Sequence, residues 1–99
     1  MKKITLICGL GMSTSMLLVS MEEAAKSKGI EVEIRAIAEA KFQEYKDHTD
    51  ILLIGPQIGY LKEKLKAKYG NSGIKIAVID SVDYGMMNGK KVLLHALSM

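Results

Sequence analysis

Ile7-Cys8-Gly9-Leu10-Gly11-Met12-Ser13-Thr14-Ser15 is the stretch that decides the fold of this 99-residue chain. It follows a short apolar run, contains the only cysteine, and ends in three successive hydroxyl side chains. A helical pattern begins where it ends. Because a strand that passes through such a loop into a helix opens a βαβ unit, the stretch predicts a parallel α/β fold. In these folds ligands bind beyond the carboxyl ends of the strands, where this loop lies.

Composition predicts one domain, residues 1–99, in a reducing compartment. The length suits a single domain, and a hydrophobic content of 48% supplies one core. A lone cysteine cannot form an internal disulfide, so we expect a cytoplasmic protein. The signal-peptide-like start, Lys2-Lys3 before an apolar run, is interrupted at Gly9. No apolar run approaches the roughly 20 residues of a membrane span, so we expect no direct membrane insertion.

The charge pattern argues against nucleic acid as a partner. The net charge is only +3, and Arg35 is the single arginine among 14 basic residues. Nucleic-acid binding favours clustered basic side chains interleaved with aromatic ones, but this chain has one phenylalanine and no tryptophan. The lysines therefore indicate a solvated surface.

Four apolar runs alternate with four helical patterns. We predict strands over residues 3–8, 31–37, 51–54 and 74–79, and helices over 14–28, 38–46, 58–69 and from 89 onward. Ser13 and Asn88 are the predicted N-caps, and Gly29 is the predicted stop of the first helix. In the second helix Phe42 and Tyr45 are predicted to face inward. Residues 55–57 and 80–87 are predicted loops.

The strand patterns also predict the topology. The second strand alternates polar and apolar residues and belongs at an edge, whereas the third is apolar on both faces and belongs in the centre. With right-handed crossovers, the expected order is 2-1-3-4 with helices on both faces. This is a three-layer α/β/α fold of the flavodoxin-like or low-molecular-weight phosphatase-like kind. The connection order reverses between strands one and three, which predicts a site there.

The chemistry of the loop after the first strand suits a phosphoryl group. Gly9 and Gly11 permit backbone N–H groups to point into one concavity, and the following helix adds its positive dipole end. The hydroxyls of residues 13–15 add donors. The same field favours the thiolate of Cys8, which is a strong nucleophile. Two plainer interpretations remain open: a buried, inert Cys8, and an ordinary tight turn at the glycines.

The chain lacks residues that several other phosphate- or cofactor-binding sites need. The C-x5-Arg loop of tyrosine phosphatases has arginine six places after the cysteine, where this chain has Thr14. Without a guanidinium, attack by water lacks its main electrostatic support, so the site should hold a phosphoryl group rather than hydrolyse it. A nucleotide-binding loop would need Gly-Lys-Ser or Gly-Lys-Thr, which does not follow the first strand. A flavin site would need aromatic walls, but this chain has no tryptophan, and such a site would give Cys8 no role. We expect no cofactor and no metal.

Three separated motifs carry a resemblance to a known family. The stretch from Cys8 to Ser15, the later loop Gly55-Pro56-Gln57-Ile58-Gly59-Tyr60, and Val78-Ile79-Asp80-Ser81 with Tyr84-Gly85 resemble the IIB components of lactose/cellobiose (chitobiose) sugar phosphotransferase systems. The likeness runs nearly end to end. It implies that Cys8 is the phosphoacceptor and that residues 9–15 form the phosphate-binding loop (Gly9, Leu10, Gly11, Met12, Ser13, Thr14 and Ser15).

The resemblance implies a phosphotransferase that works between two partners. A IIA protein would donate a phosphoryl group from a phosphohistidine to Cys8. The phosphocysteine would pass it to a sugar bound by the membrane permease IIC, a β-linked disaccharide such as cellobiose, chitobiose or lactose. The chain would then lie at the inner face of the membrane through IIC. Two alternatives stay open: a thiol phosphatase with a phosphocysteine intermediate, and a non-enzymatic flavodoxin-like interaction module.

Further side chains are assigned to the surroundings of the loop. The predicted rim consists of Pro56, Gln57, Tyr60, Asp80 and Tyr84. The alternative for Gln57 and Tyr60 is a role in the turn and the helix start. The alternative for Asp80 is to brace the loop.

Several methionines and both histidines lie outside the predicted loop chemistry or at its edge. An apolar patch of Leu10, Met12 and Met16 would contact partners or pack in the core, and Met86 and Met87 invite the same two interpretations. The two histidines, His48 and His95, are assigned to solvent.

Overall fold

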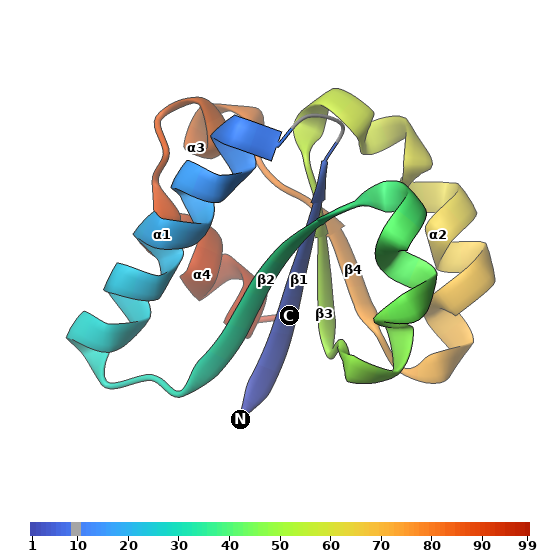
Figure 1. The fold of residues 1–99 in the computed structure, drawn as a ribbon, viewed down its shortest axis with the longest axis horizontal. Coiled ribbons are helices and arrows are strands. Elements are labelled where there is room, and N and C mark those ends of the chain that lie inside the picture. Colours follow the sequence, from blue (N-terminus) through green and yellow to red (C-terminus); the bar gives the residue numbers. More distant parts are fainter. Residues whose placement is uncertain (9–10) are drawn as a thin grey trace.

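A parallel sheet forms the centre of the computed structural model, which describes residues 1–8 and 11–99 and their side chains except at positions 8 and 11–13. Within these residues the strand order is β2-β1-β3-β4, as predicted (Figure 1). The strands are β1 (Lys2–Cys8), β2 (Val32–Ala38), β3 (Ile51–Ile54) and β4 (Lys75–Val78). All neighbours pair in parallel, and β1 lies between β2 and β3. The end of β1 therefore sits at the reversal of connection order.

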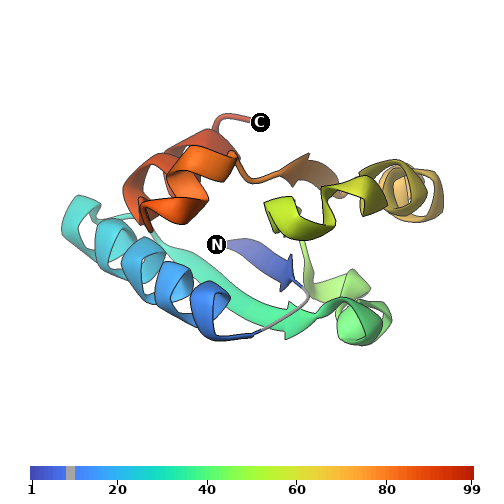
Figure 2. The same cartoon turned by 90° about the horizontal axis from the view of Figure 1, so that it is seen from above.

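Helices cover both faces of the sheet (Figure 2). One face carries α1 (Gly11–Lys28) and α4 (Gly89–Leu97), and the other carries the 3₁₀ helix η1 (Glu39–Glu44) and α2 (Lys62–Tyr69). Alternation along β1 divides the core, because Ile4 and Leu6 pack under α1 and α4 while Ile7 packs with Phe42 and Leu65. The predicted three-layer architecture is confirmed.

Helix α1 lies unusually close to the segment that starts α4. A Cβ added at Gly89 would collide with the backbone of Ser20 and Met21. The Ser20 hydroxyl donates to the carbonyl oxygen of Met87 at 3.0 Å and accepts from the Gly89 N–H at 3.0 Å. Met87 has a positive φ of 53°, which is uncommon for a residue with a side chain. A small residue and a hydroxyl thus fix α4 against α1.

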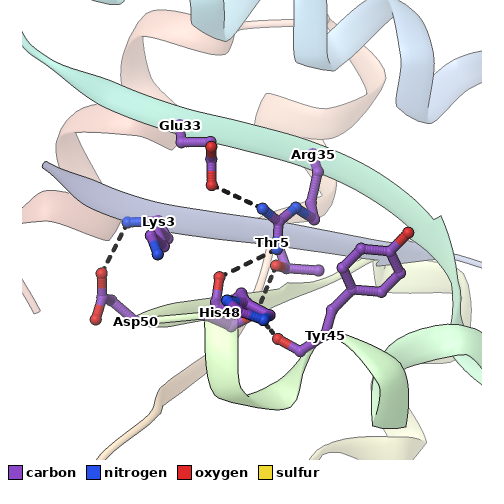
Figure 3. A network of polar contacts seen from close by, with 8 residues as sticks. Lys3, Thr5, Glu33, Arg35, Tyr45, His48 and Asp50 are labelled. Atoms are coloured by element: carbon purple, nitrogen blue, oxygen red, sulfur yellow. Dashed lines mark hydrogen bonds and ion pairs between the residues drawn. The ribbon is translucent and has the colours of Figure 1, made fainter.

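A polar network lies near the starts of β1 and β3, where residues 45–50 lead into β3 (Figure 3). The hydroxyls of Thr5 and Thr49 lie 2.7 Å apart, both buried, and the Lys3 N–H donates to Asp50 at 2.8 Å. Arg35 donates to the carbonyl oxygen of His48 at 3.1 Å. These contacts fix β1 and β2 to the chain that enters β3.

Several predicted boundaries are wrong. Helix α1 begins at Gly11, so Ser13 lies inside it and is not its N-cap. Residues 38–46 form no α-helix but the 3₁₀ helix η1, followed by η2 (Lys46–His48). Phe42 is buried as predicted, whereas Tyr45 is exposed and its ring stacks on Arg35 at 5.0 Å. Phe42 is the one buried residue of this six-residue element, which therefore has too small an apolar face to stabilise a regular α-helix.

Two later predictions are wrong for identifiable reasons. The helix expected from residue 58 begins as the 3₁₀ helix η3 (Pro56–Leu61), because Pro56 favours a first helical turn and Ile58 has a non-helical φ of −121°. The expected loop 80–87 contains α3 (Ser81–Gly85), capped by Asp80. The Asn88 cap of α4 and the left-handed Gly29 after α1 are confirmed.

Candidate functional site

The candidate site lies where β1 gives way to α1. Cys8 is the last residue of β1 and Gly11 the first of the 18-residue helix α1. The amino terminus of a helix carries a partial positive charge and N–H groups directed outward. Two residues of the predicted loop, Gly9 and Leu10, lie outside the described residues. The same holds for the side chains of Cys8, Met12 and Ser13.

Thr14 and Tyr84 meet beside this helix start. Thr14 is only 3% exposed, and its hydroxyl oxygen lies 3.3 Å from that of Tyr84, which is 6% exposed. Tyr84 belongs to α3 and lies 70 positions away in sequence. Ser15, the next predicted loop hydroxyl, is exposed. The structure thus brings one predicted loop residue and one predicted rim residue into direct contact.

The loop after β3 lies against the end of β1. The Gly55 N–H donates to the carbonyl oxygen of Ile7 at 2.8 Å, which holds the start of η3 beside the last residues of β1. Pro56 is half-buried, Gln57 is exposed, and Tyr60 is 78% exposed. These three predicted rim residues therefore belong to a segment that adjoins the candidate site.

Asp80 acts on its own helix. Its carboxylate accepts hydrogen bonds from the N–H groups of Val82 and Asp83, each at 3.1 Å, and so caps α3. The predicted bracing role of Asp80 toward the loop stays a prediction. The residue also lines an open cleft of about 570 Å³ that sequence reasoning did not find. The cleft is lined by Val78, Asp80, Val82, Asp83, Lys91 and His95.

The apolar patch divides into surface and core. Met16 is 62% exposed and Met86 is 73% exposed, whereas Met87 is half-buried and packs against the core under α1 and α4. Leu10 and Met12 lie outside the described residues or side chains. Figure 1 shows the start of α1, α3 and residues 56–61 at the same end of the molecule. His48 and His95 are both exposed, as predicted.

Residues 3–95 match the protein family described as the lactose/cellobiose-specific IIB subunit of the PTS system. The chain belongs to this IIB family. The oligo-beta-mannoside-specific EIIB component of Bacillus subtilis is 46% identical over 99 residues, which cover all of this chain and 96% of that protein. The IIB family has a role in sugar phosphotransfer, and a IIB component works with IIA and IIC components.

Solved structures agree with this membership. The cellobiose-specific phosphotransferase IIB protein of Borrelia burgdorferi superposes with a TM-score of 0.81 at 45% identity, covering 98% of this chain and 89% of the other. The YwlE arginine phosphatase, solved as a mutant with a phosphorylated active-site serine, gives a TM-score of 0.59 at 13% identity, over 94% of this chain and 91% of the other. That second likeness concerns the fold alone. In the part of this IIB chain that the structure describes, no helix is both long and apolar enough to cross a membrane.

Proposed function

We propose that this IIB protein carries a phosphoryl group on Cys8 between a IIA protein and a sugar bound by IIC. In the first step the Cys8 thiolate attacks phosphorus of a phosphohistidine, the phosphorus–nitrogen bond breaks, and the released imidazole takes up a proton. In the second step a sugar hydroxyl oxygen attacks phosphorus, the phosphorus–sulfur bond breaks, and the hydroxyl loses its proton. Residues 1–99 would act as one IIB domain at the cytoplasmic face of the membrane.

The observation that carries the proposal is the place of Cys8 in the fold. It ends β1 immediately before the amino terminus of an 18-residue helix, at the reversal of connection order in the sheet. A helix amino terminus stabilises both a thiolate and a phosphoryl dianion. The phosphate-binding role of Gly9, Leu10, Gly11, Met12, Ser13, Thr14 and Ser15 is part of the same proposal.

The residue six places after Cys8 favours a phosphoryl carrier over a phosphatase. That position is Thr14, which is buried and bonded to Tyr84, and has no positive charge. Fast hydrolysis through a cysteine needs strong electrostatic stabilisation of the transition state for attack by water. The proposed phosphocysteine should therefore persist until a partner removes the phosphoryl group.

Exposed apolar side chains support a docking role at the same end of the sheet. Met16, Tyr60, Val82 and Met86 are each more than half exposed, and exposed apolar side chains that form a patch favour protein contacts. We propose that IIA and IIC bind over this end in turn. The sugar is proposed to be a β-linked disaccharide such as cellobiose, chitobiose or lactose, because one similar IIB structure is cellobiose-specific.

Mass spectrometry after incubation with phosphorylated IIA tests the proposal. We expect one added phosphoryl group, mapped to Cys8, and none on the Cys8→Ala variant or after incubation with unphosphorylated IIA. A phosphoryl group on His48 or His95, or no transfer from several matched IIA proteins, contradicts the proposal. Repeated turnover of an aryl phosphate would instead favour a thiol phosphatase.

A further inference from the structure

The contact between Thr14 and Tyr84 joins the candidate loop to a distant part of the chain. Thr14 lies in the first turn of α1, six positions after Cys8. Its hydroxyl oxygen lies 3.3 Å from the Tyr84 hydroxyl oxygen, and either group can donate. Because both side chains are buried, water competes little for this hydrogen bond.

Tyr84 is itself fixed from both sides. Upstream, Asp80 caps α3 through the N–H groups of Val82 and Asp83. Downstream, the Met87 N–H donates to the carbonyl oxygen of Tyr84 at 3.1 Å. Its ring packs in the core shared by α1 and α4. The phenol hydroxyl therefore projects from a rigid frame toward Thr14.

The frame returns to α1 a second time. Ser20, lower on the same helix, donates to the Met87 carbonyl oxygen and accepts from the Gly89 N–H, each at 3.0 Å. Residues 84–89 thus hold α1 at two points, Thr14 and Ser20. Two separated contacts fix both the height of the helix and its rotation about its axis, which one contact alone does not achieve.

We propose that Tyr84 is a positioning residue for phosphoryl transfer. Its hydroxyl holds Thr14, and through Thr14 the first turn of α1, at a set place relative to the carboxyl end of β1, where Cys8 lies. Stabilisation of a thiolate or phosphoryl group by a helix terminus decreases steeply with distance, so the placement of that turn sets the reactivity of Cys8. The role in transfer depends on the carrier function proposed above.

The test compares Tyr84→Phe with Tyr69→Phe. Both remove one phenol oxygen from a buried ring, but Tyr69 lies in the core on the other face of the sheet. Three quantities are measured: the pH profile of Cys8 alkylation by iodoacetamide, the rate of phosphoryl transfer from phosphorylated IIA, and the melting temperature. The first reports the thiol pKa and needs no partner.

For Tyr84→Phe we expect the alkylation profile to move to higher pH and transfer to slow by about two- to tenfold, the range that one neutral hydrogen bond supplies. Tyr69→Phe should leave both the profile and the transfer rate unchanged, whatever its melting temperature. Thr14→Val should shift the alkylation profile in the same direction as Tyr84→Phe. The double variant Tyr84→Phe with Thr14→Val should shift it no further than Thr14→Val alone.

An unchanged alkylation profile for Tyr84→Phe, or simple additivity in the double variant, overturns the inference. If Tyr84→Phe does not fold, the alkylation profile of Thr14→Val decides in its place, and an unchanged profile overturns the inference. If the wild type accepts no phosphoryl group from IIA, the carrier proposal fails, and the alkylation profiles still judge whether Tyr84 positions the helix start.

Discussion

The two faces of the sheet are built differently. On one face, α1 and α4 meet closely through Ser20 and Gly89, and the segment after β4 bonds to α1 at Thr14. On the other face, the shorter helices η1 and α2 are joined by an aromatic pair, in which the rings of Phe42 and Tyr69 lie edge to face with centroids 5.0 Å apart. Figure 2 shows the two layers on either side of the strands.

The difference separates stability from chemistry. Both faces bury the sheet, but α1 alone of these four helices starts at the candidate loop. A shift of α1 moves the helix terminus on which the proposed chemistry depends, whereas a shift of η1 or α2 does not. Substitutions on the α1 face should therefore alter both stability and Cys8 reactivity, and substitutions on the other face should alter stability alone.

Phe42→Ala should give the largest loss of stability. It removes a fully buried ring from the η1 and α2 face and is expected to lower the free energy of unfolding by about 3 to 5 kcal/mol. Urea unfolding measures this loss. The pH profile of Cys8 alkylation in the folded fraction should remain that of the wild type, and a shifted profile would break the distinction between the faces. Tyr45→Ala, at an exposed ring nearby, is the control and should cost less than about 1 kcal/mol.

Gly89→Ala should give an intermediate loss with a chemical effect. The new methyl group meets the backbone of Ser20 and Met21, so α1 and α4 must separate, at an expected cost of about 1 to 3 kcal/mol. Because α1 moves, the alkylation profile of Cys8 should shift as well. Gly85→Ala is the matched control, since a Cβ there meets nothing within 4 Å. Equal behaviour of the two variants would contradict the close-packed contact.

Substitutions of Asp80 should give the smallest effect. They distinguish a role as the cap of α3 from a direct role at the rim of the site. Asp80→Ala removes the cap of α3 and should cost about 1 kcal/mol, measured by thermal unfolding. Asp80→Asn keeps a good capping side chain without the charge and should be nearly as stable as the wild type. If Asp80→Asn nevertheless changes phosphoryl transfer from IIA, the carboxylate acts on the site directly and not through α3.

Local sequence patterns predicted most of the fold. The alternating second strand and the fully apolar third strand have the predicted edge and central places, because burial on one or two faces leaves a period of two or an unbroken apolar run. The errors lie where short-range signals compete. Pro56 starts a helical turn that the loop prediction overlooked, and Asp80 caps a five-residue helix that apolar periodicity cannot reveal.

The candidate site was predictable in part for the same reason. The adjacency of Cys8 to a helix start follows from the order of residues along the chain, since strand, loop and helix are consecutive. The pairing of Thr14 with Tyr84 joins residues 70 positions apart, and no local pattern contains it. The place of Tyr84 after the fourth strand predicts a rim position, and the structure buries its side chain with the hydroxyl against Thr14.

The sequence by itself determined the order and type of most elements and put the only cysteine before the first helix, because hydrophobic periodicity and turn chemistry act over a few residues. Tertiary structure decided which distant groups support that helix: the Tyr84 hydroxyl, the Ser20 hydroxyl and the absence of a side chain at Gly89. These contacts exist only after β4 brings α3 and α4 against α1, since a hydrogen bond or a close backbone approach requires ångström-scale placement of separate elements.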